Sequence, residues 1–231
     1  MKKSTLFTLL SALVLIPGTL LLGRLLPGRG YYLTSTLVIL WILIPFFLAF
    51  EGRKPQAREL VLIAVLCALA VASRAAFAWL PHFKPIFGVI LIAGIAFGAQ
   101  TGFLVGAVSA FASNFLFGQG PWTPWQMLAY GLCGCIAGIC YHRKSKLSKD
   151  PLSLGLFGFV VVLFAVCPVL DTSTVLTTLT VFTPAAVIGI YTTAILTNLI
   201  QAACTFVTML ILSKPLLAKL ERIILKYGLH S

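Results

Sequence analysis

The sequence predicts an all-α polytopic membrane protein. Of its 231 residues, 60% are hydrophobic and 10% are charged, and the mean hydropathy is +1.05. A soluble core of this length does not need so much apolar surface. The charged residues lie between long apolar runs, where a membrane protein keeps its cytoplasmic anchors. We therefore assign the net charge of +12 to membrane anchoring, and we expect no nucleic-acid partner.

Eight apolar segments follow one another along the chain. They cover residues 5–26, 31–50, 60–80, 86–99, 102–117, 123–141, 152–169 and 184–212. A spanning helix needs roughly 20 residues, so the fourth and fifth segments are short. They are either short spans packed inside the protein or a re-entrant pair. The first segment follows Met-Lys-Lys as in a signal peptide, but it is long for one and no small-residue cleavage site follows, so we interpret it as a retained anchor.

The basic residues predict the orientation in the membrane. With the N-terminus inside, thirteen of the 17 lysines and arginines fall on the cytoplasmic side. The other four, Arg24, Arg29, Arg74 and Lys84, fall outside. The positive-inside rule favours this arrangement, which places both termini in the cytoplasm.

Three parts are expected along the chain. Residues 1–56 form a transmembrane hairpin and a cytoplasmic loop, and residues 57–213 form a six-helix substrate-binding core. Residues 214–231 form a basic amphipathic tail, in which apolar and basic residues alternate as in a helix lying on membrane lipid.

Small residues indicate where helices approach closely. Ala64, Ala68 and Ala72 are spaced by four and form a smooth face on the third segment, suited to another membrane helix. Packing inside the bundle is the alternative for this ladder, and it is the preferred interpretation for the glycines of the fourth to sixth segments. We expect a tight turn at Gln100-Thr101.

Polar residues predicted to face outward are few, and they define the candidate substrate site. Residues 117–127 contain two glycines, two prolines and two tryptophans, a composition typical of a rigid loop. The tryptophans either belong to an interfacial belt or form a binding wall beside amide groups. Arg74 either snorkels to the interface, pairs with Asp171 or meets a ligand anion. The candidate substrate-binding residues are Arg74, Asn114, Gln119, Trp122, Thr123, Trp125, Gln126 and Asp171.

An enzyme is not expected. The chain has five acidic residues, four of them predicted to be cytoplasmic, and none forms a pair suited to acid–base work. Hydrolase and phosphate-binding signatures are absent, and Cys133-x-Cys135 lacks the spacing of a zinc or redox motif. We expect no metal and no cofactor. A proton-coupled carrier keeps an acid at mid-membrane, so uphill transport would need a partner.

Residues 57–212 resemble the substrate-binding (S) component of energy-coupling factor (ECF) vitamin transporters. The resemblance rests on the six segments, the alanine ladder, the glycine-rich short helices and the Gly-Pro-Trp-Thr-Pro-Trp-Gln stretch. It implies a multi-pass subunit of a bacterial cell membrane. It also implies that Ala64, Ala68 and Ala72 dock on a transmembrane coupling subunit, which two cytoplasmic ATPases drive. The ligand would lie among the outer loops and the last three helices.

The N-terminal pair of segments departs from the usual six spans. This addition and the tryptophan-rich loop are similar to the group suspected of carrying cobalamin, so we expect cobalamin as the ligand. Another vitamin or precursor, such as a pyridoxine-like or queuosine-like compound, stays open. Two other classes also stay open: a membrane scaffold or assembly protein, and an intramembrane enzyme on isoprenoid substrates in which Arg74 and Lys84 hold phosphate.

Overall fold

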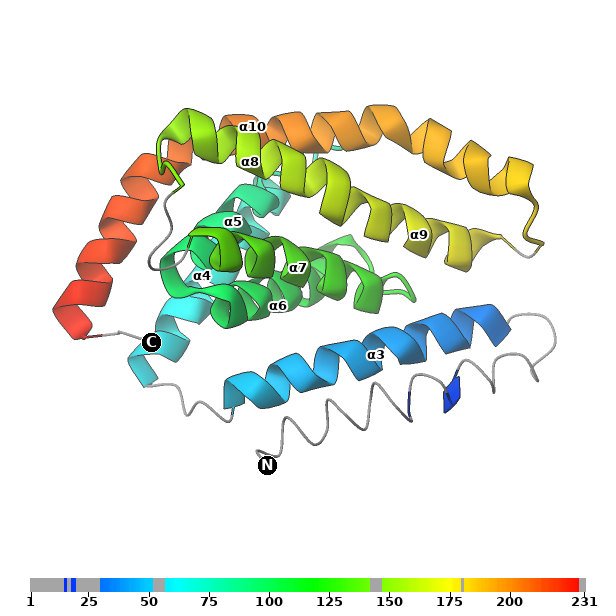
Figure 1. Ribbon diagram of the computed structural model, residues 1–231, viewed down its shortest axis with the longest axis horizontal. Coiled ribbons are helices and arrows are strands. Elements are labelled where there is room, and N and C mark those ends of the chain that lie inside the picture. The colour runs from blue at the N-terminus through cyan, green and yellow to red at the C-terminus, as the bar shows by residue number, and fades with distance from the viewer. Residues whose placement is uncertain are drawn as a thin grey trace.

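The computed structural model describes residues 30–51, 57–141, 147–179 and 181–228, together with the isolated positions 15, 18 and 19. The described residues form helices joined by short turns (Figure 1). The helices are α3 (Gly30–Glu51), α4 (Ala57–Ala76), α5 (Ile86–Phe97), α6 (Ala99–Phe117), α7 (Thr123–Tyr141), α8 (Pro151–Val161), the π-helical turn η2 (Val162–Val166), α9 (Cys167–Thr178) and α10 (Pro184–Tyr227). The predicted segment 5–26 lies outside the described residues, apart from those isolated positions.

Four helical stretches are long and apolar enough to cross a membrane: α4, α6, the continuous rod of α8, η2 and α9, and α10. This confirms the prediction of an all-α, polytopic membrane protein. The predicted bounds of 123–141 are those of α7, and α3, α5 and α6 begin and end within three residues of the predicted segments.

Two predicted helix ends are wrong, and both helices run further than expected. The rod of α8, η2 and α9 continues to Thr178 instead of ending at residue 169. Its polar end is compatible with a helix, because the hydroxyls of Thr172, Thr174 and Thr178 find acceptors in the backbone carbonyls four residues earlier. α10 continues to Tyr227 instead of ending at residue 212, and it bends near Pro215, close to the predicted boundary between core and tail (Figure 1).

Two predicted turns also shift. α4 ends at Ala76 rather than at residue 80, and residues 77–85 form a series of turns closed by backbone hydrogen bonds such as Leu80 N–H to the Phe77 carbonyl (3.0 Å). The tight turn between α5 and α6 lies at Gly98 rather than at Gln100-Thr101. Gly98 has a φ of 90°, a value that favours glycine, which explains the shift.

Glycines hold α5, α6 and α7 together at very short range. A Cβ added to Gly94 would lie 2.1 Å from the Gly134 carbonyl oxygen, and one added to Gly102 would lie 2.4 Å from the same atom. A Cβ on Gly106 would lie 2.1 Å from the carbonyl oxygen of Tyr130. This confirms the interpretation of these glycines as packing positions inside the bundle.

α5 begins partway down the bundle. Phe87, at its start, packs edge-on against Tyr130 of α7, with ring centroids 4.7 Å apart. Tyr130 lies seven residues below the start of α7, which corresponds to roughly 10 Å along the helix. At the other end, Gly138 of α7 meets Gly98 and Ala99. α5 is therefore a short buried helix that runs in the same direction as α7.

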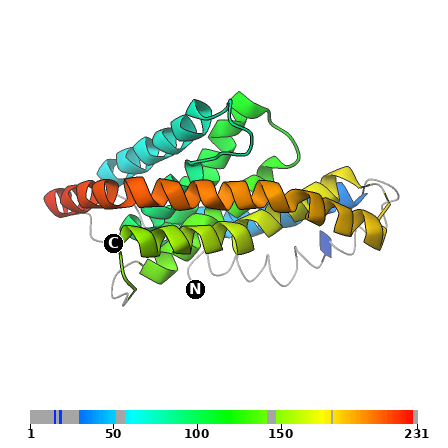
Figure 2. The same ribbon diagram turned by 90° about the horizontal axis from the view of Figure 1, so that it is seen from above.

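The remaining helices cover this centre. α10 lies beside the rod of α8, η2 and α9, as both views show, while α3 lies along α6 and α7 (Figures 1 and 2). Ile39 and Leu43 of α3 join Phe103, Trp125 and Leu128 in one apolar cluster. α3, which corresponds to the predicted segment 31–50, therefore packs on the core of its own chain.

Candidate substrate site and docking face

We call the end of the bundle that holds the last turn of α4, the last turn of α6 and the first turn of α7 the outer end. The sequence predicts that this end faces outside. Arg74 of α4 donates from Nη1 to Ser113 Oγ (2.5 Å) and to Asn114 Oδ1 (3.2 Å), both on α6. Asn114 in turn donates from Nδ2 to Thr123 Oγ1 (3.1 Å) and Gln126 Oε1 (2.8 Å) on α7. One hydrogen-bonded chain thus links three helices.

The loop between α6 and α7 belongs to the same network. Thr123 Oγ1 donates to Gln119 Oε1 (2.9 Å) and accepts from the Gly120 N–H (3.2 Å), while Gln119 Nε2 donates to the Phe111 carbonyl (3.0 Å). The indole of Trp122 lies against Gly120, where a Cβ would come within 2.5 Å of the ring. The loop is held by the side chains that the sequence singled out.

Arg74 is buried, with 8% of its surface exposed. Its guanidinium stacks on the ring of Phe117 at 4.4 Å. The alternatives of a snorkelling side chain and of a pair with Asp171 are therefore wrong for this structure. Asp171 of α9 instead accepts a hydrogen bond from Asn198 Nδ2 of α10 (2.7 Å). A ligand anion beside Arg74 remains as the third alternative.

The two tryptophans of the loop differ in environment. Trp122 is 42% exposed at the outer end, whereas Trp125 is 9% exposed and packs in the cluster with Ile39 and Leu43 of α3. The indole N–H of Trp125 has no acceptor among the described residues. Trp122 is thus available as a binding wall, and the burial of Trp125 favours a packing role.

Lys84 adds a functional candidate that the sequence analysis named only for the alternative of an intramembrane enzyme and not for the substrate site. It lies in the turns between α4 and α5, near the thiol of Cys167, and its backbone amide lies near Cys204. Burial, together with the charge of Arg74, lowers the pKa of Lys84 to about 8. The signal available in the sequence was a lysine immediately before Pro85 and the apolar α5, at the point where the chain enters the bundle.

Two further polar groups are candidates for contact with a ligand. Gln201 Oε1 on α10 and Ser173 Oγ on α9 are buried and have no hydrogen-bond partner among the described residues. Nearby on the same two helices, Thr172 Oγ1 and the Tyr191 hydroxyl are 2.8 Å apart. Unsatisfied buried groups are rare in folded proteins, so these two are candidates for contact with a ligand or water.

The alanine ladder lies on the free side of α4. Ala64, Ala68 and Ala72 are exposed, whereas Ile63, Leu66, Cys67, Ala70 and Arg74 of the same helix are buried against the rest of the chain. The ladder is therefore not used for packing within the described part of this chain. We call its three alanines the alanine face.

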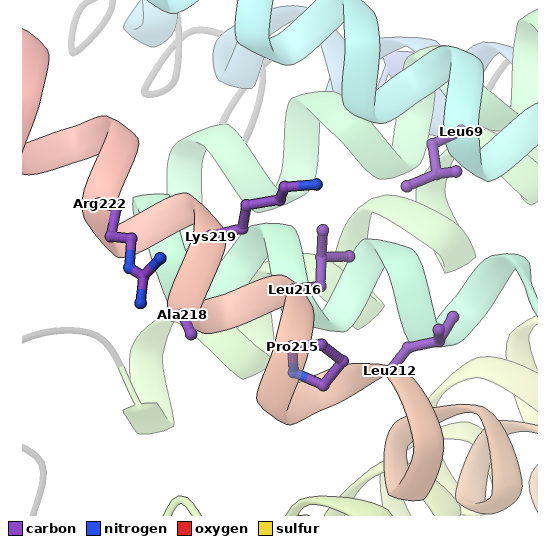
Figure 3. A pocket seen from close by; sticks show the side chains of 7 residues that line it. All are labelled: Leu69, Leu212, Pro215, Leu216, Ala218, Lys219 and Arg222. Carbon is purple, nitrogen blue, oxygen red and sulfur yellow. The ribbon is translucent and has the colours of Figure 1, made fainter.

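An open groove continues from this helix toward the end of the bundle opposite the outer end. It has a volume of about 520 Å³ and lies between Leu69 of α4 and the bent second half of α10 (Figure 3). Leu212, Pro215, Leu216 and Ala218 line it together with Lys219 and Arg222. Lys219 extends from α10 toward the side of the groove on which Leu69 lies (Figure 3).

These features define a class of protein. The chain is a multi-pass membrane protein with a polar network at one end and an unoccupied small-residue face along one helix. No group of three or more histidines, cysteines or acids in the described parts of the chain is placed to hold a metal ion.

Comparison with known families identifies it more closely. A model of the family described as "ECF-type riboflavin transporter, S component" matches residues 54–220, which is more than half of the chain. The chain therefore belongs to this family. Its members are non-catalytic subunits of multi-pass membrane transporters, which confirms that the chain is not an enzyme.

One curated relative extends the comparison. It is a UPF0397 protein of Vibrio atlanticus (strain LGP32), 29% identical over 114 residues. The matched region covers 47% of this chain and 62% of that protein, so the chain spans less than two thirds of its curated relative. The comparison with solved structures gave no match.

These findings support the alternative of another vitamin better than the expected cobalamin. The matched family is of the riboflavin type, and nothing in the comparison supports cobalamin. Of the two features that suggested cobalamin, the N-terminal pair of segments lies before the matched region, whereas the tryptophan-rich loop lies within it.

Proposed function

We propose that this chain is the substrate-binding subunit of an ECF-type vitamin importer and that its ligand is riboflavin or a closely related flavin. The observation that carries the proposal is the family match over residues 54–220, which spans the six-helix core from α4 to the bent part of α10.

The outer end has the chemistry that a flavin needs. The isoalloxazine ring is flat and aromatic with amide-like edges, and the ribityl chain carries hydroxyls. Trp122 offers an exposed aromatic face, and Gln119 and Gln126 place amide groups beside it. Gln201 and Ser173 offer polar atoms that lack partners. Such a site combines apolar area with a few placed polar groups, as small-molecule sites do.

The alanine face supports docking on a coupling subunit. Its residues are exposed while the other side of α4 is buried, and small residues allow close approach between membrane helices. We place the transmembrane coupling subunit on this face and two ATPases on the cytoplasmic side. The groove beside Leu69 and Lys219 extends the face and would receive part of the coupling subunit.

Titration of the purified, detergent-solubilised protein with riboflavin tests the ligand. Flavin fluorescence should be quenched with one-to-one stoichiometry, and Trp122→Ala should weaken binding by about 0.5–1.5 kcal/mol beyond the lost contact area. A folded protein that binds no flavin would refute the ligand.

Uptake of labelled riboflavin tests the transport role. Cells that contain the chain with the coupling module should accumulate the vitamin, and cells that lack the module should not. Uptake at full rate without the module would refute the role as an importer subunit.

A further inference from the structure

Two positive charges at the outer end, on Arg74 and Lys84, form no ion pair with a carboxylate of the described residues. Arg74 is buried near the end of α4, and Lys84 is half-buried in the turns that follow. Each is near enough to the other for the charge of Arg74 to affect Lys84. Within the described ranges of the chain, neither has a carboxylate within 4 Å. A buried charge is unfavourable unless it is paired, so this pair calls for an explanation.

Both side chains have donors to spare. The guanidinium has five N–H donors, and the hydrogen bonds to Ser113 and Asn114 both leave from Nη1. Nε and Nη2 of Arg74 and Nζ of Lys84 make no hydrogen bond to the described residues, and none of these atoms is sealed from solvent. They are therefore free to bind a group that enters from outside.

The fold places Lys84 inside the bundle. Because α5 starts level with Tyr130, residues 77–85 must carry the chain inward from the end of α4. Lys84 thereby comes to lie near Cys167 of α9 and Cys204 of α10. A ligand bound among the outer loops and these helices would meet both cations.

The other titratable groups nearby do not neutralise the pair. Asp171 lies beyond Cys167 and accepts a hydrogen bond from Asn198. Tyr130 and Cys133 are fully buried in the core. His82, on the same loop as Lys84, is exposed. With two cations and one carboxylate, this region carries a net charge of +1, which one acidic group on a ligand would balance.

We propose that the substrate of this chain carries an anionic group, a carboxylate or a phosphate, which binds between Arg74 and Lys84. This inference rests on the proposed function, because it takes the outer end to be the substrate site. It adds a selection rule: within one class of ligand, the acidic member binds more tightly than its neutral counterpart. Arginine and lysine donors to an anion give strong, charge-assisted hydrogen bonds.

Riboflavin and riboflavin 5′-phosphate form a matched pair, since they differ by one phosphate. We expect the purified protein to bind the phosphate ester about tenfold more tightly or better, as one charge-assisted hydrogen bond implies. Equal affinity, or tighter binding of riboflavin, would overturn the inference while leaving the proposed function intact.

Four variants make the comparison specific. Lys84→Met should reduce the affinity ratio to about threefold or less, and Lys84→Arg should restore most of it. Lys149→Met, which removes a charge paired with Glu221 at 3.9 Å near the cytoplasmic end, should leave the ratio unchanged. Asp171→Asn should raise the ratio, because it removes a competing negative charge. If the Lys84 side chain instead pairs with the carboxylate of Asp171, the wild-type protein will show no preference for the phosphate ester, and the inference is overturned. Thermal unfolding checks that each variant is folded.

If neither flavin binds, the proposed ligand is wrong, and other pairs then decide the inference. Pyridoxal with pyridoxal 5′-phosphate, and nicotinamide with nicotinate, are compared by thermal stabilisation of the same protein. Stabilisation by the acidic member of a pair supports the anion site. Stabilisation by the neutral member, or by no member of any pair, overturns it.

Discussion

At the scale of single residues, Asn114 is the junction of the outer network. Its side chain accepts from Arg74 and donates to Thr123 and Gln126. Asn114→Leu keeps the branched shape of the side chain but removes the acceptor of a buried cation, so we expect a loss of about 1–3 kcal/mol in stability. Thermal unfolding in detergent measures it, with Gln100→Ala, at an exposed position of the same helix, as the control. An unfolding temperature unchanged by Asn114→Leu would mean that the network does not stabilise α6 against α7.

The pKa of Lys84 predicts how the preference for riboflavin 5′-phosphate changes with pH. Its pKa is lowered to about 8, so its positive charge is present at pH 7 and is lost as the pH rises through 8. A phosphate monoester is fully ionised above its second pKa of about 6, so its own charge stays constant in this range. We therefore expect the preference for riboflavin 5′-phosphate over riboflavin to fall between pH 7 and 9. In Lys84→Met the ratio should not change with pH. A parallel decline in the variant would assign the effect to another group.

The residues of the site were easier to predict than their partners. Arg74, Asn114, Thr123 and Gln126 stood out as polar groups in apolar surroundings, and the structure joins them in one network. The residues that accept the hydrogen bonds of Arg74 lie about 40 positions later in the sequence, on α6. Their identity depends on how α4 packs against α6, and no local sequence pattern predicts that packing. The same holds for Trp125, because its burial depends on where α3 packs.

At the scale of helices, close packing of α5, α6 and α7 depends on Gly134. A methyl group there would lie 2.2 Å from the Gly102 carbonyl oxygen, and backbone cannot move aside cheaply. We expect Gly134→Ala to destabilise the fold by about 1–3 kcal/mol, the usual range for overpacking. Gly189→Ala in α10, where a Cβ meets nothing within 4 Å, is the matched control. Equal unfolding temperatures for the two variants would contradict this packing.

The alanine face of α4 gives a prediction about transport rather than stability. Ala68→Leu adds bulk where the chain itself makes no contact, so folding and flavin binding should persist. Uptake with the coupling module should fall several-fold, because the two helices can no longer approach closely. Ala203→Leu is the control: Ala203 is also exposed, but it lies two and a half helical turns from Leu212 and faces away from the groove. Equal uptake by both variants would contradict the proposal that the alanine face docks on the coupling subunit.

Hydropathy predicted the positions of the helices well, but it missed helix ends at which polar residues continue the helix. The bounds of α7 were predicted because Pro124 marks its start and basic residues follow its end. The end of α9 was missed because Asp171 and the threonines lower the hydropathy, although their side chains bond to helix carbonyls and to Asn198. The end of α10 was missed because Pro215 reads as a stop, whereas the helix bends there and continues.

At the scale of the whole molecule, α3 is an addition to a core that has its own centre. The large apolar cluster contains residues of α4 to α10 and none of α3, which contributes to a second, smaller cluster around Trp125. The family match likewise begins after α3, at residue 54. Removal of residues 1–51 should therefore lower the unfolding temperature, because Phe103, Trp125 and Leu128 lose packing partners.

Flavin binding should survive this truncation. The outer network from Arg74 to Gln126 contains no residue of α3, and Lys84 lies near α9 and α10. Fluorescence titration of residues 52–231 beside the full chain measures the affinity, and circular dichroism verifies that the shortened protein is helical. A tenfold change in affinity corresponds to about 1.4 kcal/mol. An affinity of the truncated protein within about threefold of that of the full chain would mean that α3 contributes to packing and not to flavin binding. Loss of binding by a folded truncation would instead place α3 in the support of the site, through Trp125 at the first turn of α7, which also carries Thr123 and Gln126.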